Sequence, residues 1–300
     1  MQDWFTVLIP TKDSAAWIGA LLSHYQARGV TPTLLLDDRT TDATRAIAER
    51  AGAPVVDIHG FTHTEAIVSV ARDFVRTPWA LMVHDDEVPS EKLFARLAGP
   101  PPPDAADTVA VPRRWAWYVP GQPLQYGRSA QWQDRTGQHG NDHHWRMFRP
   151  ERVIYTPTMH WDGYFIDRWS RVPLDHYIIH FEWVLRSHMQ RMAKIRRYDE
   201  HRWGYGKFFE KLYLPESQAP GVIEYLPFET DAYDRLAETY FAARAAGAVL
   251  PRRSLRWRLE TVKHWIAGRI FKPNFSRDAA DRAGLHVKPE CEIEDLFNVL

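Results

Sequence analysis

The chain of 300 residues is nearly devoid of cysteine, with Cys291 alone. A single cysteine excludes an internal disulfide and any zinc site built from several cysteines, and it is typical of a reducing, cytoplasmic compartment. Long hydrophobic runs are also missing: no stretch approaches the roughly 18 apolar residues of a membrane span, and the acid in the opening MQDWFTVLIPTKD argues against a signal peptide. Neither charge is in excess, because 38 lysines and arginines balance 38 aspartates and glutamates, so no global field attracts nucleic acid.

The first hundred residues do contain a regular alternation of short apolar runs and helical spacing. The apolar runs lie at 5–9, 33–36, 54–58 and 80–83, separated by helical patterns at 15–28, 43–51 and 65–75. This alternation predicts βαβ units, and hence an α/β fold with a mostly parallel sheet flanked by helices. A segment rich in tryptophan, tyrosine, arginine and histidine follows from 113 to 186, and helical patterns return from 187 onward.

Polar and mostly acidic clusters end three of these four runs: Pro10–Asp13, Asp37-Asp38 and His84–Glu87. Ligands of parallel sheets bind beyond the carboxyl ends of the strands, so the clusters are the first candidates for a site. Asp37 and Asp38 suit hydrogen bonds from a base or from ribose hydroxyls, as acidic residues do in nucleotide-binding folds. The residues after them, Thr40–Asp42, are also typical of a helix cap.

The cluster His84–Glu87 emerges from a buried run and accumulates negative charge. Neighbouring carboxylates repel one another unless a cation neutralises them. Carboxylate oxygens suit Mg²⁺ or Mn²⁺, which bind through one or two carboxylates together with substrate phosphates. The alternative is an acidic surface turn ahead of a helix that begins near Ser90.

Three segments, VLIPTKD, LLLDDRTTDAT and WALMVHDDEVPS, resemble the nucleotide-binding segments of family 2 glycosyltransferases, which have the GT-A (Rossmann-like) fold. The resemblance covers residues 5–90, in the order and at the spacing of that family. It implies that a nucleotide-diphosphate sugar, the donor, binds at one set of residues. These are Pro10, Thr11, Asp13, Asp37, Asp38, Arg72, His84 and Asp85.

The same resemblance implies a divalent cation, Mg²⁺ or Mn²⁺, at the cluster His84–Glu87, which we call the acidic turn. Asp86 aligns with the second aspartate of the family's DxD motif, the usual metal ligand, whereas His84 stands in place of the first. GT-A enzymes often supply a histidine late in the chain as a second protein ligand to the metal, and His180, which follows an apolar run, resembles that ligand. The alternative is that His180 is only a hydrogen-bonded histidine at the end of a strand.

The aromatic segment extends the resemblance to lipopolysaccharide-core-type members of the family. The stretch DHHWRMFR, which begins at Asp142, is similar to their DWxLRLFRR pattern. Asp142 then falls where such inverting enzymes place the base that removes the acceptor's proton, and Asp162 is the alternative base. We expect Arg146 and Arg149 to lower the pKa of Asp142 by proximity, without clamping its carboxylate directly.

The implied function is inverting transfer of a sugar to an acceptor hydroxyl on a glycan or lipid-linked glycan. Residues 1–112 would form the donor-binding half, 113–186 the aromatic, acceptor-binding half of the same domain, and 187–300 a C-terminal helical region. One alternative is a degenerate GT-A scaffold that binds nucleotide or glycan without turnover. Another, a sugar nucleotidyltransferase, needs a glycine-rich phosphate loop, and the stretch 11–16 contains no glycine.

The segment 252–272 carries seven basic residues and one acid. Its apolar residues fall on one helical face, so we expect 252–271 to form a basic amphipathic helix that either packs on the domain or lies in a membrane interface. We therefore expect a cytoplasmic protein, with peripheral contact to the inner face of the membrane if the second alternative holds.

Overall fold

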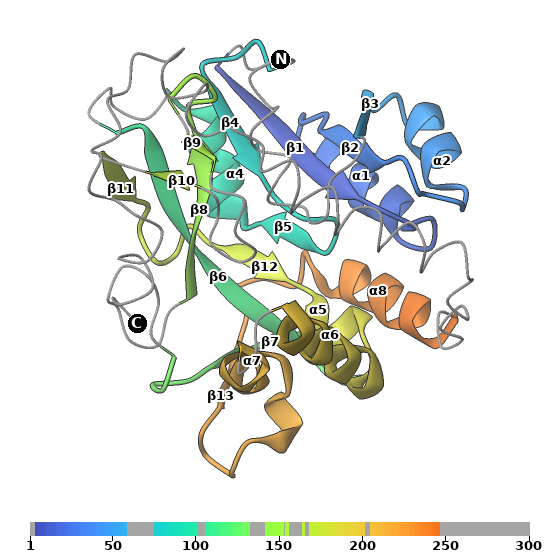
Figure 1. Ribbon diagram of the computed structural model, residues 1–300, viewed down its shortest axis with the longest axis vertical. Coiled ribbons are helices and arrows are strands. Elements are labelled where there is room, and N and C mark those ends of the chain that lie inside the picture. Colours follow the sequence, from blue (N-terminus) through green and yellow to red (C-terminus); the bar gives the residue numbers. More distant parts are fainter. Residues whose placement is uncertain are drawn as a thin grey trace.

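The computed structural model describes residues 4–58, 75–100, 106–132, 142–152, 154–155, 164–165, 168–201 and 205–246. A mixed sheet of 11 strands runs through these residues, with helices packed against it (Figure 1). A separate pair of short strands consists of β9 (Ile154–Tyr155) and β10 (Tyr164–Phe165).

The N-terminal half of the sheet is parallel, in the order β3-β2-β1-β4. Its strands are β1 (Phe5–Thr11), β2 (Thr33–Asp37), β3 (Val55–Ile58) and β4 (Trp79–Met82). Both faces of β1 are buried, because Val7 and Ile9 belong to one apolar cluster and Leu8 to another, as is typical of parallel strands. The first cluster also contains residues of α1 (Ile18–Gln26), α2 (Thr44–Arg50) and α4 (Glu91–Ala98).

The second half of the sheet begins where β4 pairs antiparallel with β8. Its strands are β5 (Glu87–Pro89), β6 (Thr108–Trp117), β7 (Gln125–Arg128), β8 (Asp142–Phe148), β11 (Trp169–Arg171), β12 (Ile178–His180) and β13 (Glu224–Pro227). The long strand β6 pairs with β7 and β8 antiparallel and with β11 and β12 parallel. Because β12 also pairs with β5, His180 lies opposite Glu87, and a late segment of the chain reaches the acidic turn.

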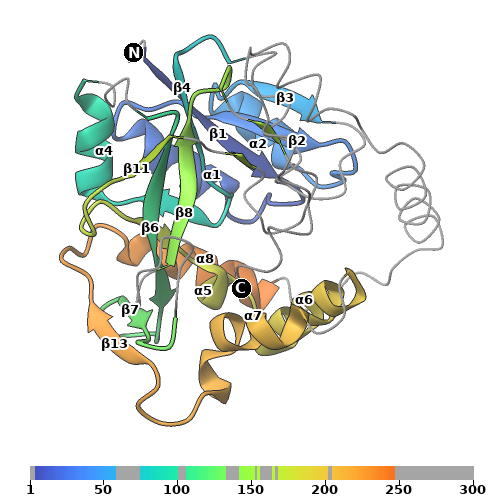
Figure 2. The same ribbon diagram turned by 60° about the vertical axis from the view of Figure 1, so that its left-hand side comes forward.

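The C-terminal helices gather where β6 ends and β8 begins (Figure 2). They are α5 (Glu182–Leu185), α6 (His188–His201), α7 (Tyr205–Tyr213), the 3₁₀ turn η2 (Pro215–Ser217) and α8 (Asp234–Ala246). Helix α8 packs against α1 and α5 through a stripe at helical spacing that includes Leu236, Ala237 and Tyr240. A third cluster, mostly aromatic, includes Trp115, Trp132, Trp183, Phe209 and Tyr213 and joins β6 to α5 and α7.

The α/β fold predicted from the alternation is confirmed. The four predicted apolar runs coincide with β1 to β4, and the first two helical patterns coincide with α1 and α2. Nearly all of the third pattern, 65–75, lies outside the described residues, as does the whole of 252–271. Among the helices that are described, none has the length and apolar character needed to cross a membrane.

Candidate active site

The acidic turn between β4 and β5 is buried and held from within by Glu87. This carboxylate, with no exposed surface, accepts hydrogen bonds from the His84 backbone N–H (2.9 Å), from Arg146 (2.7 Å) and from Arg113 (3.3 Å). Burial opposes ionisation of Glu87, but Arg146 and the other nearby cations hold its pKa far below the usual range. With Asp86 only 5% exposed as well, the alternative of an acidic surface turn does not describe this segment.

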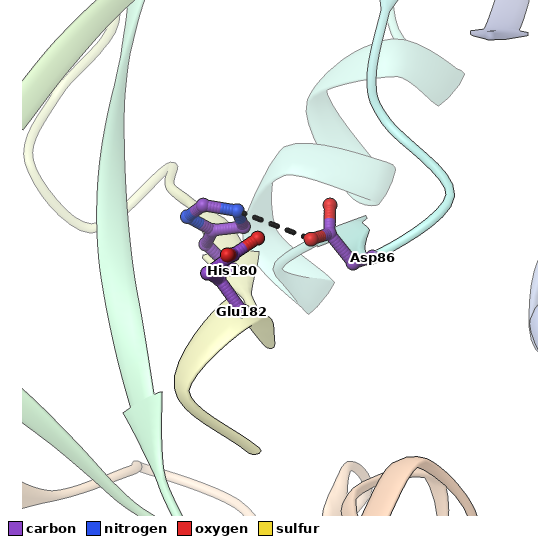
Figure 3. A group of neighbouring side chains, drawn as sticks. All are labelled: Asp86, His180 and Glu182. Carbon is purple, nitrogen blue, oxygen red and sulfur yellow. Dashed lines mark ion pairs between the residues drawn. The ribbon is translucent and has the colours of Figure 1, made fainter. Parts of the chain in front are cut away.

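Three buried side chains converge beside the turn (Figure 3). Asp86 belongs to the turn, His180 ends β12 and Glu182 begins α5, and one possible ligand atom of each lies within 4.8 Å of the others. The Asp86 Oδ2 and His180 Nε2 atoms are 3.4 Å apart. Two carboxylates so far removed from water require compensating positive charge.

One carboxylate oxygen of this triad suits a metal ion. Within the described part of the chain, Glu182 Oε1 is buried without a hydrogen-bond partner, while His180 turns its Nε2 toward Asp86. The other oxygen of Glu182, Oε2, accepts from Lys194 Nζ (2.9 Å) and Arg186 Nε (3.1 Å). Two carboxylates and one imidazole offer both oxygen and nitrogen, a donor set that fits Mn²⁺ more closely than Mg²⁺, which prefers oxygen.

Both carboxylates of the triad are held in the ionised form. Burial opposes ionisation of Asp86, but the adjacent His180 places its pKa well below the usual range. Burial also opposes ionisation of Glu182, but the positive charges of Lys194 and Arg186 outweigh it and lower the pKa of this carboxyl. Ionised carboxylates are the form that binds a metal, so near neutral pH no proton has to leave them first.

Asp85 connects the acidic turn to the end of β1. Its Oδ2 accepts hydrogen bonds from Thr11 Oγ1 (2.8 Å) and from the Ser14 hydroxyl. These bonds fix the end of β1 and the turn relative to each other. Burial and the negative charge of Asp86 raise the pKa of Asp85, whereas the pKa of Asp86 is lowered.

Asp13 makes a comparable connection between the loops after β1 and β2. It has a positive φ of 48°, uncommon for a residue other than glycine, and its Oδ1 accepts from the Thr41 backbone N–H (2.8 Å). Asp42 accepts from the backbone N–H groups of Ala15 and Thr44, each at 2.9 Å. Its bond to Thr44 N is an interaction with the first residue of α2. The N-cap residue of this helix is Ala43, which makes no side-chain cap hydrogen bond, so the helix-capping alternative for 40–42 is not what the structure has.

A polar pocket of about 260 Å³ opens at the end of β2. It is lined by Leu36, Asp37, Asp38, Thr40, Thr41, Asp42, Arg45 and Asp57. Asp37 accepts from both the backbone N–H and the Nε of Arg39, each at 2.8 Å. Burial opposes ionisation of Asp37, but Arg39 lowers its pKa below the usual value. Both aspartates predicted at this strand end therefore face one concave space.

Asp142, at the start of β8, is held by three donors. Its Oδ2 accepts from Arg113 Nε (2.8 Å) and Trp115 Nε1 (2.7 Å), and its Oδ1 lies 2.9 Å from His144 Nε2. Burial opposes ionisation, but Arg113 and His144 hold the pKa of Asp142 well below its usual range. This arrangement differs from the expected one, because an arginine contacts the carboxylate directly and Arg146 pairs with the acidic turn instead.

The predicted residues fall into three places. Thr11, Asp85, Asp86 and His180 form one connected group, and the pocket at β2 is a second place. The start of β8 is the third, and it adjoins the first group because Arg113 contacts both Asp142 and Glu87. Pro10 lies within β1, next to this group. Arg72 and Asp162 lie outside the described residues.

Glu182 is the main site residue that the sequence pattern did not single out. Its signal is local: it stands two residues after His180, immediately beyond the end of a strand, and an H-x-E spacing can place two ligand atoms together. The cations that pair with it are Arg186, four residues on, and Lys194, twelve residues on and in the next helix, α6. Nothing in their local pattern distinguishes them from surface cations.

No known protein-family model matches the chain. Over 84 residues the chain is 34% identical to the glycosyltransferase AglJ of Haloferax volcanii, a match that spans 28% of this chain and 28% of that protein. Among solved structures, the mannosyltransferase PcManGT from Pyrobaculum calidifontis in complex with GDP-Man and Mn²⁺ is 14% identical, with a TM-score of 0.43 over 99% of this chain and 88% of that chain. TarS residues 1–349 of S. aureus is 13% identical, with a TM-score of 0.40 over 88% and 78%. Likenesses this weak assign no activity to the chain.

Proposed function

We propose that the chain is a GT-A glycosyltransferase that moves a sugar from a nucleotide-diphosphate donor to an acceptor hydroxyl. The observation that carries the proposal is the buried triad of Asp86, His180 and Glu182, with an unpaired carboxylate oxygen. The three nucleotide-binding-like segments over residues 5–90 and the short match to a curated glycosyltransferase support it.

The triad would hold Mn²⁺ or Mg²⁺, which when bound would neutralise charge on the departing diphosphate. Arg186 adds a cation at the same place, since its side chain is 36% exposed and its pKa is raised by Glu182 and the other acids of the site. It would therefore bind a phosphate oxygen of the donor. Lys194, which donates to Glu182 Oε2, would keep that carboxylate oriented.

The pocket at β2 would receive the nucleoside part of the donor. Asp37 and Asp38 both line this pocket and would accept hydrogen bonds from ribose hydroxyls or base N–H groups. Thr11, Asp13, His84 and Asp85 would shape the path between this pocket and the metal, with Arg72 as a further donor contact.

Inverting transfer requires a carboxylate that takes the proton of the attacking hydroxyl, and Asp142 would be this base. Its three present donors keep it ionised but make it a weak base, so the acceptor would have to replace one of them. His144, which contacts Oδ1, is the partner that the acceptor hydroxyl would replace. Asp162 remains the alternative base.

The finer assignments are part of the same proposal. The chain would be a family 2 enzyme of the lipopolysaccharide-core type, with 1–112 binding the donor, 113–186 binding a glycan or lipid-linked glycan, and 187–300 forming the helical region. Residues 252–271 would contact anionic lipid at the cytoplasmic face of the membrane.

The test measures Mn²⁺ binding by calorimetry and nucleoside-diphosphate release from UDP-, GDP- and dTDP-hexoses. Asp86→Asn and Glu182→Gln should weaken Mn²⁺ binding by about 10² or more, because even groups that only support a ligand contribute 10- to 100-fold. Asp175→Asn is the matched control, since this exposed acid pairs with Lys92 at the surface.

Each result separates the alternatives. Metal-dependent release of one nucleoside diphosphate supports the transferase. Metal and nucleotide binding without release would instead identify a non-catalytic scaffold. Mn²⁺ binding that survives both triad substitutions would remove the metal site from the proposal.

A further inference from the structure

Helix α8, in the C-terminal region, carries a buried tyrosine, Tyr240, that contacts the chain neighbours of the triad residues. The Tyr240 hydroxyl donates a 2.9 Å hydrogen bond to the backbone carbonyl of Asp85, within the acidic turn. The ring of Tyr240 stacks on Phe181, with ring centroids 4.8 Å apart and an interplanar angle of 26°. Phe181 is the residue between the two other members of the triad.

These contacts reach both segments that carry the candidate ligands. Asp85 directly precedes Asp86, and Phe181 is flanked by His180 and Glu182. The Phe181 backbone N–H also donates to the Asp86 carbonyl (2.8 Å), so the two segments touch at the point that Tyr240 covers. The Tyr240 side chain thus contacts both the acidic turn and the residue just before α5, and it helps to fix the distance between them.

The hydroxyl of Tyr240 has a specific reason to be there. The residue has no exposed surface, and a buried hydroxyl without a partner is destabilising, so phenylalanine would fill an apolar site better. Burial and the neighbouring acids raise the pKa of Tyr240 well above its ordinary value. The hydroxyl therefore stays protonated and remains a donor to the Asp85 carbonyl.

We infer that Tyr240 is a positioning residue of the metal site, which sets the distance between Asp86 and the pair His180 and Glu182 from outside the triad. The inference rests on the proposed function, in that the triad binds a divalent cation. Groups that orient metal ligands from behind typically contribute 10- to 100-fold to metal affinity. A helix distant in sequence from the acidic turn would in this way tune the site (Figure 1).

The test compares Tyr240→Phe with Tyr233→Phe. Tyr233 is an apt control because it is equally buried and directly precedes α8. Its hydroxyl accepts a 2.7 Å hydrogen bond from the backbone N–H of Glu91, which is not a member of the triad. Mn²⁺ affinity is measured by calorimetry and by electron paramagnetic resonance of the free ion, and Tm by differential scanning fluorimetry.

We expect Tyr240→Phe to raise the Kd for Mn²⁺ about 10-fold, and Tyr233→Phe to leave it within twofold, at similar Tm changes. Equal Mn²⁺ affinity in Tyr240→Phe and the wild type, or equal weakening in both variants, would overturn the positioning role while the metal site stands. If the wild type itself does not bind Mn²⁺, the proposed metal site fails and the positioning role fails with it. Phe181→Leu keeps the hydroxyl and removes the stacked ring, and it should weaken Mn²⁺ binding in the same direction.

Discussion

Arg146→Met removes the closest charged partner of a fully buried carboxylate. The Arg146 side chain is 3% exposed, and its Nη2 lies 2.7 Å from Oε1 of Glu87, which has no exposed surface. Breaking a buried ion pair from one side typically destabilises a protein by about 3–5 kcal/mol, because the remaining charge stays desolvated. Arg113 still lies 3.3 Å from Glu87, so we expect a loss near the lower limit, about 3 kcal/mol.

The pH dependence of this loss distinguishes charge from packing. In the wild type, the depressed pKa of Glu87 contributes stability that is present above the unfolded-state pKa of 4.5 and is lost as the pH falls. In Arg146→Met, burial is less strongly opposed, so the pKa of Glu87 rises and protonation relieves the buried charge. The stability difference between the two proteins should therefore be largest near pH 7 and narrow below about pH 5.

The assay is urea unfolding followed by tryptophan fluorescence at pH 7 and pH 4.5. Arg45→Met is the matched control, because Arg45 pairs with Asp57 while the two side chains are 43% and 46% exposed, and such pairs contribute about 0–1 kcal/mol. The double variant Glu87→Gln/Arg146→Met should be more stable at pH 7 than Arg146→Met, since no unpaired charge stays buried. A loss in Arg146→Met that is independent of pH, or no larger than that of the control, would refute the electrostatic reasoning.

Two further predictions concern the candidate base and a buried histidine. Asp142→Asn should lower kcat by about 10² or more with little change in the donor Kd, because it removes the basic group and keeps the shape of the side chain. Asp162→Asn should lower kcat less, and the reverse ranking would assign the role of the base to Asp162. Burial and Arg28 lower the pKa of His24 from 6.5 to about 4, so the unfolded state takes up the proton first as the pH falls below 6.5 and stability is lost down to about pH 4. Between pH 7 and pH 5 this amounts to about 2 kcal/mol, which urea unfolding should show in the wild type and not in His24→Leu.

The local elements of the N-terminal half of the sheet, and the polar character of their ends, are encoded in the amino-acid sequence alone. Apolar runs become β1 to β4 because both faces of a parallel strand are buried, and this requirement leaves a continuous apolar run in the chain. Acids that follow such runs emerge at one edge of the sheet, so the acidic turn at Asp85 and Asp86 is identifiable from residue types and their order.

Which side chains meet depends on the tertiary structure. Two partners of Asp142, Arg113 and Trp115, come from β6, 29 and 27 residues away in the chain, through an antiparallel register that local periodicity does not specify. Glu182 reaches Asp86 because β12 pairs with both β5 and β6, and Tyr240 reaches the same place because α8 packs on α5. Residue types and short spacings record the propensity of a segment, whereas the pKa of a buried carboxylate depends on charges that long-range pairing brings within hydrogen-bond distance.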